Sequence, residues 1–224
     1  IDRVVRAIDG FLAVRDSLST PDHPVVRTVA VATSAARDAC NAAEFAARLR
    51  ERGIELSVIP GSREAALSFS GASIDFSGER LMVVDVGGGS TEVVMGTGGA
   101  EPLCAHSFNV GCRRVTEKFL ASDPPAPEEL ALARAWIREQ MASWFADQAK
   151  EAASLERVIA VAGTATTVVS IRERMETYDS SRVHKALVSR QDLLEVYERL
   201  AALPLSERMQ VVGLDPKRAP VMVA

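Results

Sequence analysis

Several absences narrow the classes of protein to which this 224-residue sequence can belong. No apolar run approaches the ~20 residues that a membrane-spanning helix needs. The first residues, IDRVVRAIDG, have the spacing of an amphipathic helix rather than of a secretory signal. Basic residues are not in excess, since 26 Lys and Arg are interleaved with 30 Asp and Glu for a net charge of −4, which disfavours a nucleic-acid-binding protein. We therefore expect a soluble, cytoplasmic protein.

Cysteine and histidine are also scarce. The three cysteines, Cys40, Cys104 and Cys112, are an odd number without CxxC spacing, which favours reduced thiols over a disulfide framework. The three histidines are scattered along the chain, so a zinc site is not expected.

The length and composition fit a globular protein of one large domain or two small ones. Hydrophobic residues make up 47% and charged residues 25% of the sequence, which is ordinary for this class. The sequence opens on Ile1 and ends on the apolar run APVMVA, whereas natural termini are usually polar. We therefore expect a fragment of a longer protein.

Apolar periodicity predicts an alternation of strands and helices. Strands are predicted at 25–33, 55–60, 81–86, 91–96, 101–110 and 157–163, and helices at 1–18, 35–52, 63–72, 111–120, 127–150, 164–175 and within 191–212. Ser62 is predicted as the N-cap of the helix that follows it. Because the strands are continuous apolar runs between helices, the pattern indicates an α/β fold with a covered sheet.

Polar stretches rich in Gly, Ser and Thr follow four of the predicted strands. They are TSAAR (33–37), GSREA (61–65), DVGGGSTE (85–92) and AGTATT (162–167). In open α/β sheets, ligands bind beyond the carboxyl ends of the strands. The repetition of such junctions therefore predicts a ligand site built from several of them.

The stretch DVGGGSTE has the composition of an anion-binding turn. Glycines let backbone N–H groups approach an anion without side-chain obstruction, and neighbouring hydroxyl groups add donors. The predicted phosphate-binding residues of this turn are Gly87, Gly88, Gly89, Ser90 and Thr91.

The carboxylates Asp85 and Glu92 flank that turn and would repel a phosphate. Their position is explained if a divalent cation or an attacking water lies between them and the phosphate. Mg²⁺, or Mn²⁺ in its place, suits this role because it bridges carboxylates to phosphate oxygens and retains water ligands. The alternative is a glycine-rich hairpin that carries two solvated acids.

The other junctions carry further candidates. Gly163 and Thr164 lie where a strand passes into a helix, whose N-terminus attracts anions, although Thr164 could simply be a helix cap. Ser34 and Arg37 lie within one helical turn and are predicted to contact phosphate, although Arg37 could be an ordinary exposed arginine. Glu64 lies in a first helical turn, where an acid also stabilises the helix dipole.

Together these junctions resemble the exopolyphosphatase/guanosine pentaphosphate phosphatase (Ppx/GppA) family, within the actin-like ATPase (ribonuclease H-like) superfold. The resemblance runs through nearly the whole chain. It rests on the order and spacing of ATSAARDACN (32–41), IPGSREAALSFSGA (59–72), VVDVGGGSTEVVMG (83–96), VGCRRVTEKF (110–119) and VAGTATT (161–167).

The resemblance implies two actin-like lobes, with 1–75 in the first and 76–224 in the second. It implies Mg²⁺-dependent release of terminal phosphate from polyphosphate, or conversion of guanosine pentaphosphate to tetraphosphate, by a homodimer. It gives Glu64 the catalytic role and places Asp85 and Glu92 at the metal. The phosphate contacts that it implies come from the two glycine-containing turns and from Arg37, and the stretch 191–212 is a candidate interface.

The sequence also departs from the family pattern. Members begin with strands that carry a D-x-G-[ST]-N-S phosphate loop, and they continue beyond the equivalent of Ala224, so we expect an incomplete first lobe. The tripeptide SRE (62–64) replaces the usual acid pair and leaves Glu64 alone.

Two other functions fit the same residues. One is an ATP-dependent kinase of the same superfold, and the other is a sensor that binds polyphosphate or guanosine tetraphosphate without cleaving it. A pure binder gains nothing from three acids beside phosphate, which favours the hydrolase.

Overall fold

In the computed structural model, which describes residues 1–224, the chain divides into two units, Ile1–Pro60 and Gly61–Ala224. The division follows the contacts within the chain and groups the helix that carries Glu64 with the second unit. The predicted boundary between actin-like lobes at residue 75 stays a prediction.

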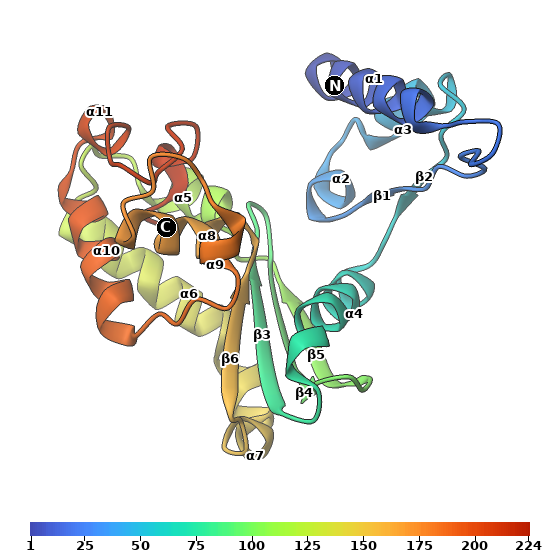
Figure 1. Ribbon diagram of the computed structural model, residues 1–224. Coiled ribbons are helices and arrows are strands. Elements are labelled where there is room, and N and C mark those ends of the chain that lie inside the picture. Colours follow the sequence, from blue (N-terminus) through green and yellow to red (C-terminus); the bar gives the residue numbers. More distant parts are fainter. The chain divides into compact units, whose positions relative to one another are not determined.

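The first unit contains a small parallel sheet and three helices (Figure 1). In chain order the elements are α1 (Asp2–Leu18), β1 (Ala30–Ala32), α2 (Ser34–Asp38), α3 (Ala42–Arg50) and β2 (Leu56–Val58). β1 and β2 pair in parallel, with Ala30 opposite Leu56. The buried apolar side chains of this unit are Val5, Leu49 and Ile54.

Two predictions for the first unit are corrected. The strand predicted at 25–33 is only three residues long, because its partner β2 offers only three residues for pairing, and Val26 is 89% exposed. The helix predicted at 35–52 is broken after Asp38, where Ala39 has an extended backbone. Asn41 then precedes α3, a position that asparagine prefers to a helix interior.

The second unit is built on a mixed four-stranded sheet in the order β5-β4-β3-β6. Its strands are β3 (Arg80–Val86), β4 (Thr91–Thr97), β5 (Pro102–Phe108) and β6 (Arg157–Val161). β4 is antiparallel to β3 and β5, whereas β6 is parallel to β3. The predicted hairpin around the glycine-rich turn is therefore confirmed.

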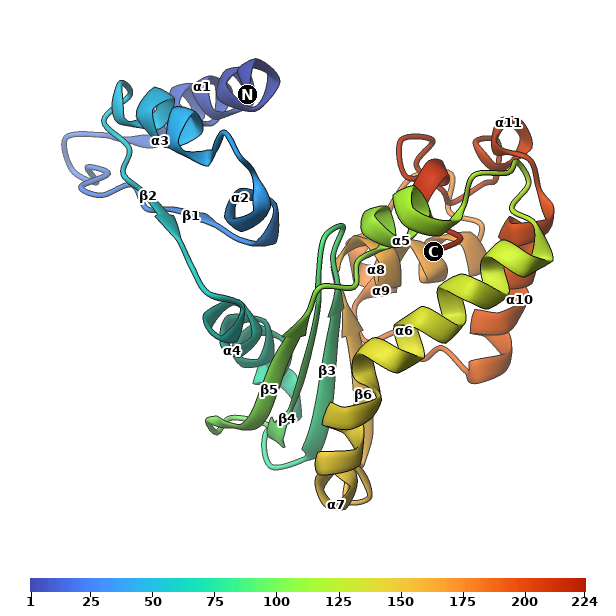
Figure 2. The same ribbon diagram turned by 180° about the vertical axis from the view of Figure 1, so that it is seen from behind.

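Helices cover both faces of this sheet (Figures 1 and 2). On one face, α4 (Gly61–Ala72) packs Phe69 against Leu81, Val83 and Val94, beside the short helix η1 (Ile74–Phe76). On the other face, α6 (Pro127–Asp147) packs Trp136 and Trp144 into an apolar cluster with Phe108 of β5. Both tryptophans are half-buried in this cluster.

The remaining helices of this unit follow β5 along the chain, and parts of them build a second core beside the sheet. They are α5 (Cys112–Phe119), α7 (Ala149–Ala152), α8 (Ala162–Arg172), α9 (Ser180–Val183), α10 (Arg190–Ala202), α11 (Leu205–Arg208) and η2 (Ala219–Val221). Residues of α8, α10 and the segment after α11 form this core, among them Val168, Leu200 and Leu214. In the predicted interface stretch 191–212, Val196 and Leu200 are buried within the unit itself.

The α/β fold class is confirmed, with local corrections in the second unit. α4 begins at Gly61, so Ser62 lies inside the helix and is not its N-cap. β6 ends at Val161, which places Gly163 within α8 rather than in the strand. No helix of the chain combines the length and apolarity that crossing a membrane requires.

Candidate active site

Two carboxylates lie side by side where the central hairpin approaches its turn. Asp85 on β3 and Glu92 on β4 are direct partners in the antiparallel ladder. Side chains alternate along a strand, so both acids project from the same face as Val83 and Val94, which pack against α4. The face that is apolar beneath Phe69 therefore becomes acidic at the turn end of the sheet.

Two serine hydroxyls hold these carboxylates. Ser68 of α4 donates a hydrogen bond of 2.6 Å from its hydroxyl to Oδ2 of Asp85. Ser107 of β5 donates one of 2.6 Å to Oε1 of Glu92. Glu92 is only 2% exposed, which excludes the alternative of a solvated hairpin acid for this residue.

Burial raises the pKa of Glu92 above its usual value, and the nearby charges of Glu64 and Asp85 raise it further. The hydroxyls of Ser107 and Ser90 oppose this effect by hydrogen bonding. The three predicted acids are therefore electrostatically coupled. Such a cluster of like charges gains stability from a cation among them.

Glu64 reaches this acidic end from α4. It lies in the first turn of the helix, as predicted, and is half-buried. Residues four positions apart share one face of a helix, so Glu64 and Ser68 project from the same side of α4. The helix thus presents a carboxylate and a hydroxyl donor toward Asp85 and Glu92.

The glycine-rich turn directs its carbonyl groups toward α5. The backbone N–H of Cys112 donates to Gly87 O, and those of Arg113 and Arg114 donate to Gly88 O. Arg114 Nε also donates to Gly89 O at 2.9 Å.

The carbonyls of the turn are therefore occupied, whereas three of its amides are not. Gly87 N–H closes the turn by donating to Ser90 O, whereas the N–H groups of Gly88, Gly89 and Ser90 donate to no acceptor of the protein. Successive free amides of this kind form an anion-binding concavity.

The hydroxyl groups of the turn have other partners. Thr91 Oγ1 donates to Val110 O at 2.5 Å on the face opposite the acids, so it is not available to a phosphate. The Ser90 hydroxyl is directed to Glu92, and Ser90 is buried. The groups of this turn that are left free to meet an anion are therefore backbone amides.

A second turn lies beside the first because β3 and β6 are parallel and Asp85 is level with Val161. β6 passes directly into α8, whose N-terminus has no side-chain cap. Ala162 has φ of +66°, a left-handed conformation that is strained for a residue other than glycine. Thr164 Oγ1 donates to Val86 O at 3.2 Å and so joins the two turns.

The structure explains why residue 163 is a glycine, which the sequence alone did not. A Cβ atom at this position would overlap the guanidinium group of Arg218, which lies directly against the turn. Arg218 is exposed, and its guanidinium makes no hydrogen bond or ion pair within the protein. A cation thus stands at the N-terminus of α8, beside the two turns. Sequence reasoning missed Arg218 because nothing in DPKRAP marks it locally.

Ser34 and Arg37 belong to the first unit, whereas the other predicted site residues belong to the second. Ser34 is buried at the start of α2. Arg37 is half-buried and donates from Nη1 to Ile59 O at 2.8 Å, so it is not the freely exposed arginine of the alternative interpretation. It links the ends of β1 and β2.

The acidic cluster fits a hydrated magnesium ion. No three His, Cys, Asp or Glu side chains lie close enough to form a complete metal-binding group by themselves. Mg²⁺ typically takes one or two carboxylates and completes its shell with water and phosphate oxygens. Asp85 and Glu92, facing each other across the ladder beside the free amides, supply such a donor set.

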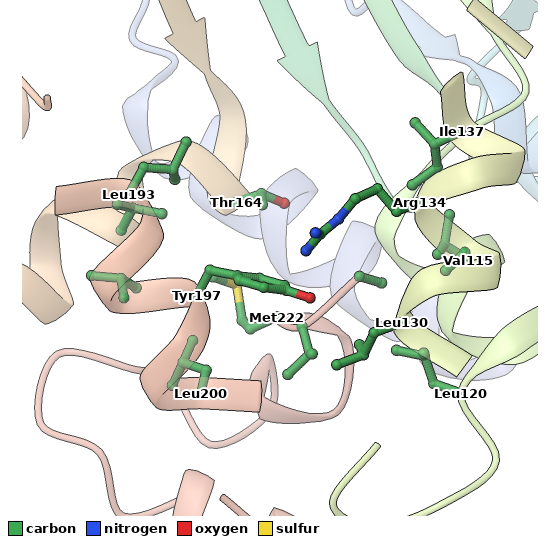
Figure 3. Close-up of a pocket in the computed structure, with 15 residues that line it drawn as sticks. Val115, Leu120, Leu130, Arg134, Ile137, Thr164, Leu193, Tyr197, Leu200 and Met222 are labelled. Carbon is green, nitrogen blue, oxygen red and sulfur yellow. The ribbon is translucent and has the colours of Figure 1, made fainter. Parts of the chain in front are cut away.

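A separate cavity of about 210 Å³ lies between α5, α6, α8 and α10 (Figure 3). Its walls are mostly apolar, and Thr164 is shared with the turn before α8. Arg134 lies over the ring of Tyr197, 5.4 Å from its centre.

Comparison with known proteins identifies relatives over the whole sequence. The family model described as "Ppx/GppA phosphatase family" matches residues 1–224. "Exopolyphosphatase 2" of Mycobacterium tuberculosis is 37% identical over 211 residues, which are 89% of this chain and 64% of that protein. The chain therefore spans somewhat less than two thirds of this curated relative.

Solved structures show the same fold. An exopolyphosphatase from Cytophaga hutchinsonii superimposes with a TM-score of 0.85 at 26% identity, covering 99% of this chain and 70% of that one. The PPX-GPPA enzyme of Aquifex aeolicus superimposes with a TM-score of 0.78 at 26% identity, covering 99% of this chain and 71% of that one. These neighbours confirm the predicted family fold.

Proposed function

Because this chain belongs to the Ppx/GppA phosphatase family, we propose that the protein hydrolyses phosphoanhydride bonds at the end of inorganic polyphosphate. One observation carries the proposal. Asp85 and Glu92 face each other at the same end of one sheet as the free amides of the glycine-rich turn, the uncapped start of α8 and an exposed guanidinium. Anion-binding groups next to paired carboxylates suit phosphoryl transfer to water.

Glu64 is the proposed general base. Its carboxylate takes a proton from a water molecule as the water oxygen forms a bond to the terminal phosphorus. The bond from that phosphorus to the bridging oxygen breaks, and the shortened chain leaves with the bridging oxygen as an anion. Glu64 suits this role because it is half-buried and belongs to the coupled acid cluster. A positioned base contributes roughly 10²–10⁴ in rate.

The backbone and Arg218 stabilise the charge that develops on the phosphoryl oxygens. The N–H groups of Gly88 and Gly89 are free to donate, and α8 presents its uncapped N-terminus. The guanidinium of Arg218 adds a positive charge beside Gly163. Donors fixed before the reaction are the main source of such stabilisation.

Asp85 and Glu92 would hold Mg²⁺, whose charge would offset that of the phosphate chain. Ser68 and Ser107 orient these two carboxylates. Burial, and to a smaller degree the charges of Glu64 and Asp85, raises the pKa of Glu92, and a bound cation would offset both effects.

Guanosine pentaphosphate is the second proposed substrate, because it ends in the same phosphoanhydride. The groups at the two turns contact phosphate and do not distinguish the two substrates. The Aquifex aeolicus neighbour is described as a PPX-GPPA enzyme.

The test is phosphate release by the complete protein from each substrate, with and without Mg²⁺. We expect metal-dependent release that Glu64→Gln reduces by roughly 10²–10⁴ without loss of binding. Glu139→Gln, an exposed acid on α6, is the matched control and should leave the rate unchanged. An undiminished rate in Glu64→Gln would remove Glu64 from its role. Tight binding of either substrate without release would make the protein a sensor.

A further inference from the structure

Arg208, the last residue of α11, is a buried cation that the proposed mechanism does not use. It is 3% exposed. Nε donates to Leu200 O at 3.0 Å, and Nη2 donates to Leu203 O at 2.8 Å. Nη1 donates to Ala219 O at 3.3 Å.

The contacts with Leu200 and Leu203 explain only part of the burial of Arg208. The carbonyls of Leu200 and Leu203 lie at the C-terminal end of α10, where a cation is favourable. Burial nevertheless lowers the pKa of Arg208, and the Asp123 carboxylate, 4.0 Å from Nη2, only partly opposes this. A buried charge is costly unless its donors are satisfied, so the contact with Ala219 is part of what retains Arg208.

The contact with Ala219 leads toward the proposed active site. Ala219 directly follows Arg218, whose guanidinium lies against Gly163. Further back in the same segment, Gly213 has φ of +91°, and a Cβ there would overlap Ser170 O of α8. The segment from 213 to 219 therefore follows α8 from its buried last turn to its N-terminal turn.

Packing shows that this segment is held between two helices. Leu214, Ala219 and Met222 share one apolar cluster with Leu200 of α10 and Val168 of α8. Figure 3 shows Leu200 and Met222 on the same cavity wall, with Thr164 of α8 facing them. Apolar packing restrains the segment as a whole, whereas Arg208 fixes the backbone of the residue next to Arg218.

We propose that Arg208 is a positioning residue that holds the 213–219 segment so that Arg218 is directed at the phosphate chain above Gly163. The proposal rests on the proposed function and extends it to a residue that contacts no substrate. Lysine cannot replace the planar group, because a single ammonium cannot donate to three carbonyls in these directions.

A double-mutant cycle on the complete protein tests this role. The variants are Arg208→Lys, Arg218→Ala and both together, read by KM and kcat for polyphosphate and by Tm. We expect Arg218→Ala to raise KM by roughly 10–100-fold through loss of a charged contact. Arg208→Lys should raise KM by about tenfold alone and should change it no further in the Arg218→Ala background. The exposed Arg199→Lys is the control and should alter neither KM nor Tm.

Additive effects of the two substitutions on KM, or a lower Tm with unchanged KM, would show that Arg208 is only structural. If Arg208→Lys does not fold, Gly213→Ala displaces the same segment at Ser170, and its effect on KM should likewise vanish in the Arg218→Ala background. If the wild type releases no phosphate, the cycle is read by the affinity for labelled polyphosphate. Losses of affinity that are not additive would then support the positioning role of Arg208, although the proposed hydrolysis has failed. No binding of polyphosphate at all would overturn both the positioning role and the proposed function.

Discussion

Asp85 on β3 and Glu92 on β4 are direct cross-strand partners on the face of the sheet that packs against α4. Like charges in this relationship destabilise a sheet, and here the pair is also partly removed from water. The serine donors Ser68 and Ser107 lessen the cost by hydrogen bonding to the two carboxylates. The two carboxylates therefore repel each other in the folded protein, and protonation or a bound cation would reduce this repulsion.

The first prediction concerns the pH dependence of stability in metal-free protein. The pKa of Glu92 is raised above 4.5, with burial as the largest cause. Between 4.5 and the raised pKa the folded state binds more protons than the unfolded state, so this residue makes the free energy of unfolding fall as the pH rises through that window. Glu92→Gln removes this decline.

Thermal melts in a chelating buffer, from about pH 4 to about pH 8, check this prediction. The Tm of Glu92→Gln relative to the wild type should increase with pH, whereas Glu139→Gln should follow the wild type. Parallel curves for Glu92→Gln and the wild type would contradict the raised pKa. Added Mg²⁺ should raise the Tm of the wild type most at the upper end of the range.

The second prediction concerns the hydroxyl that orients Asp85. Ser68→Ala removes the 2.6 Å hydrogen bond to Oδ2, so we expect the Mg²⁺ concentration for half-maximal activity to rise by about 10–100-fold. Ser68→Thr keeps a hydroxyl and should recover most of the loss. Ser70→Ala, on the same helix, removes only a hydroxyl contact to Ala66 O and is the matched control. Equal metal dependence of Ser68→Ala and Ser70→Ala would remove Ser68 from this role.

Local patterns predicted what is local in this site. The turn between β3 and β4 and the two acids beside it follow from the stretch 81–96, whose strand period and turn composition agree. The same period also implies that the side chains of Thr91 and Glu92 lie on opposite faces of the sheet, because neighbours on a strand alternate between faces. The hydroxyl of Thr91 is accordingly turned toward Val110 and away from the acids.

The contacts that complete the site come from tertiary packing. Ser68 meets Asp85 because α4 crosses β3, and Arg218 meets Gly163 because the segment after α11 follows α8. Neither pair has a sequence signature, since an isolated serine on a helix and an arginine in a loop are common. The break between α2 and α3 was missed for a similar reason, because the apolar period continues through it.

The third prediction uses the strained residue between β6 and α8. Ala162 has φ of +66°, which costs an alanine about 1–2 kcal/mol relative to glycine. Ala162→Gly should therefore raise the free energy of unfolding by about 1 kcal/mol and Tm by about 2–4 °C. Ala165→Gly, inside α8, should lower the free energy of unfolding by about 1 kcal/mol. Thermal melts of both variants check the opposite signs, and a loss of Tm in both would mean that Ala162 is not strained.

The fourth prediction concerns the close approach of α5 to the glycine-rich turn. A Cβ at Gly111 would lie 2.5 Å from the carbonyl carbon and oxygen of Gly88 and 2.6 Å from the carbonyl carbon of Gly89. These are backbone atoms, so they cannot rotate away as the end of a side chain can. Gly111→Ala must therefore push the turn out of place, together with the amides proposed to bind phosphate.

Because a displacement of about 1 Å at a reacting group can cost roughly 10²-fold in rate, we expect a loss of that order in kcat/KM for Gly111→Ala. Gly71→Ala in α4 is the matched control, since a Cβ there meets nothing within 4 Å. It should stabilise the helix by about 0.5–1 kcal/mol and leave the kinetics unchanged. Steady-state kinetics and thermal melts of the two variants separate a local displacement from global unfolding. A Gly111→Ala variant with wild-type kcat/KM would show that the amides of the turn do not hold the reacting phosphate.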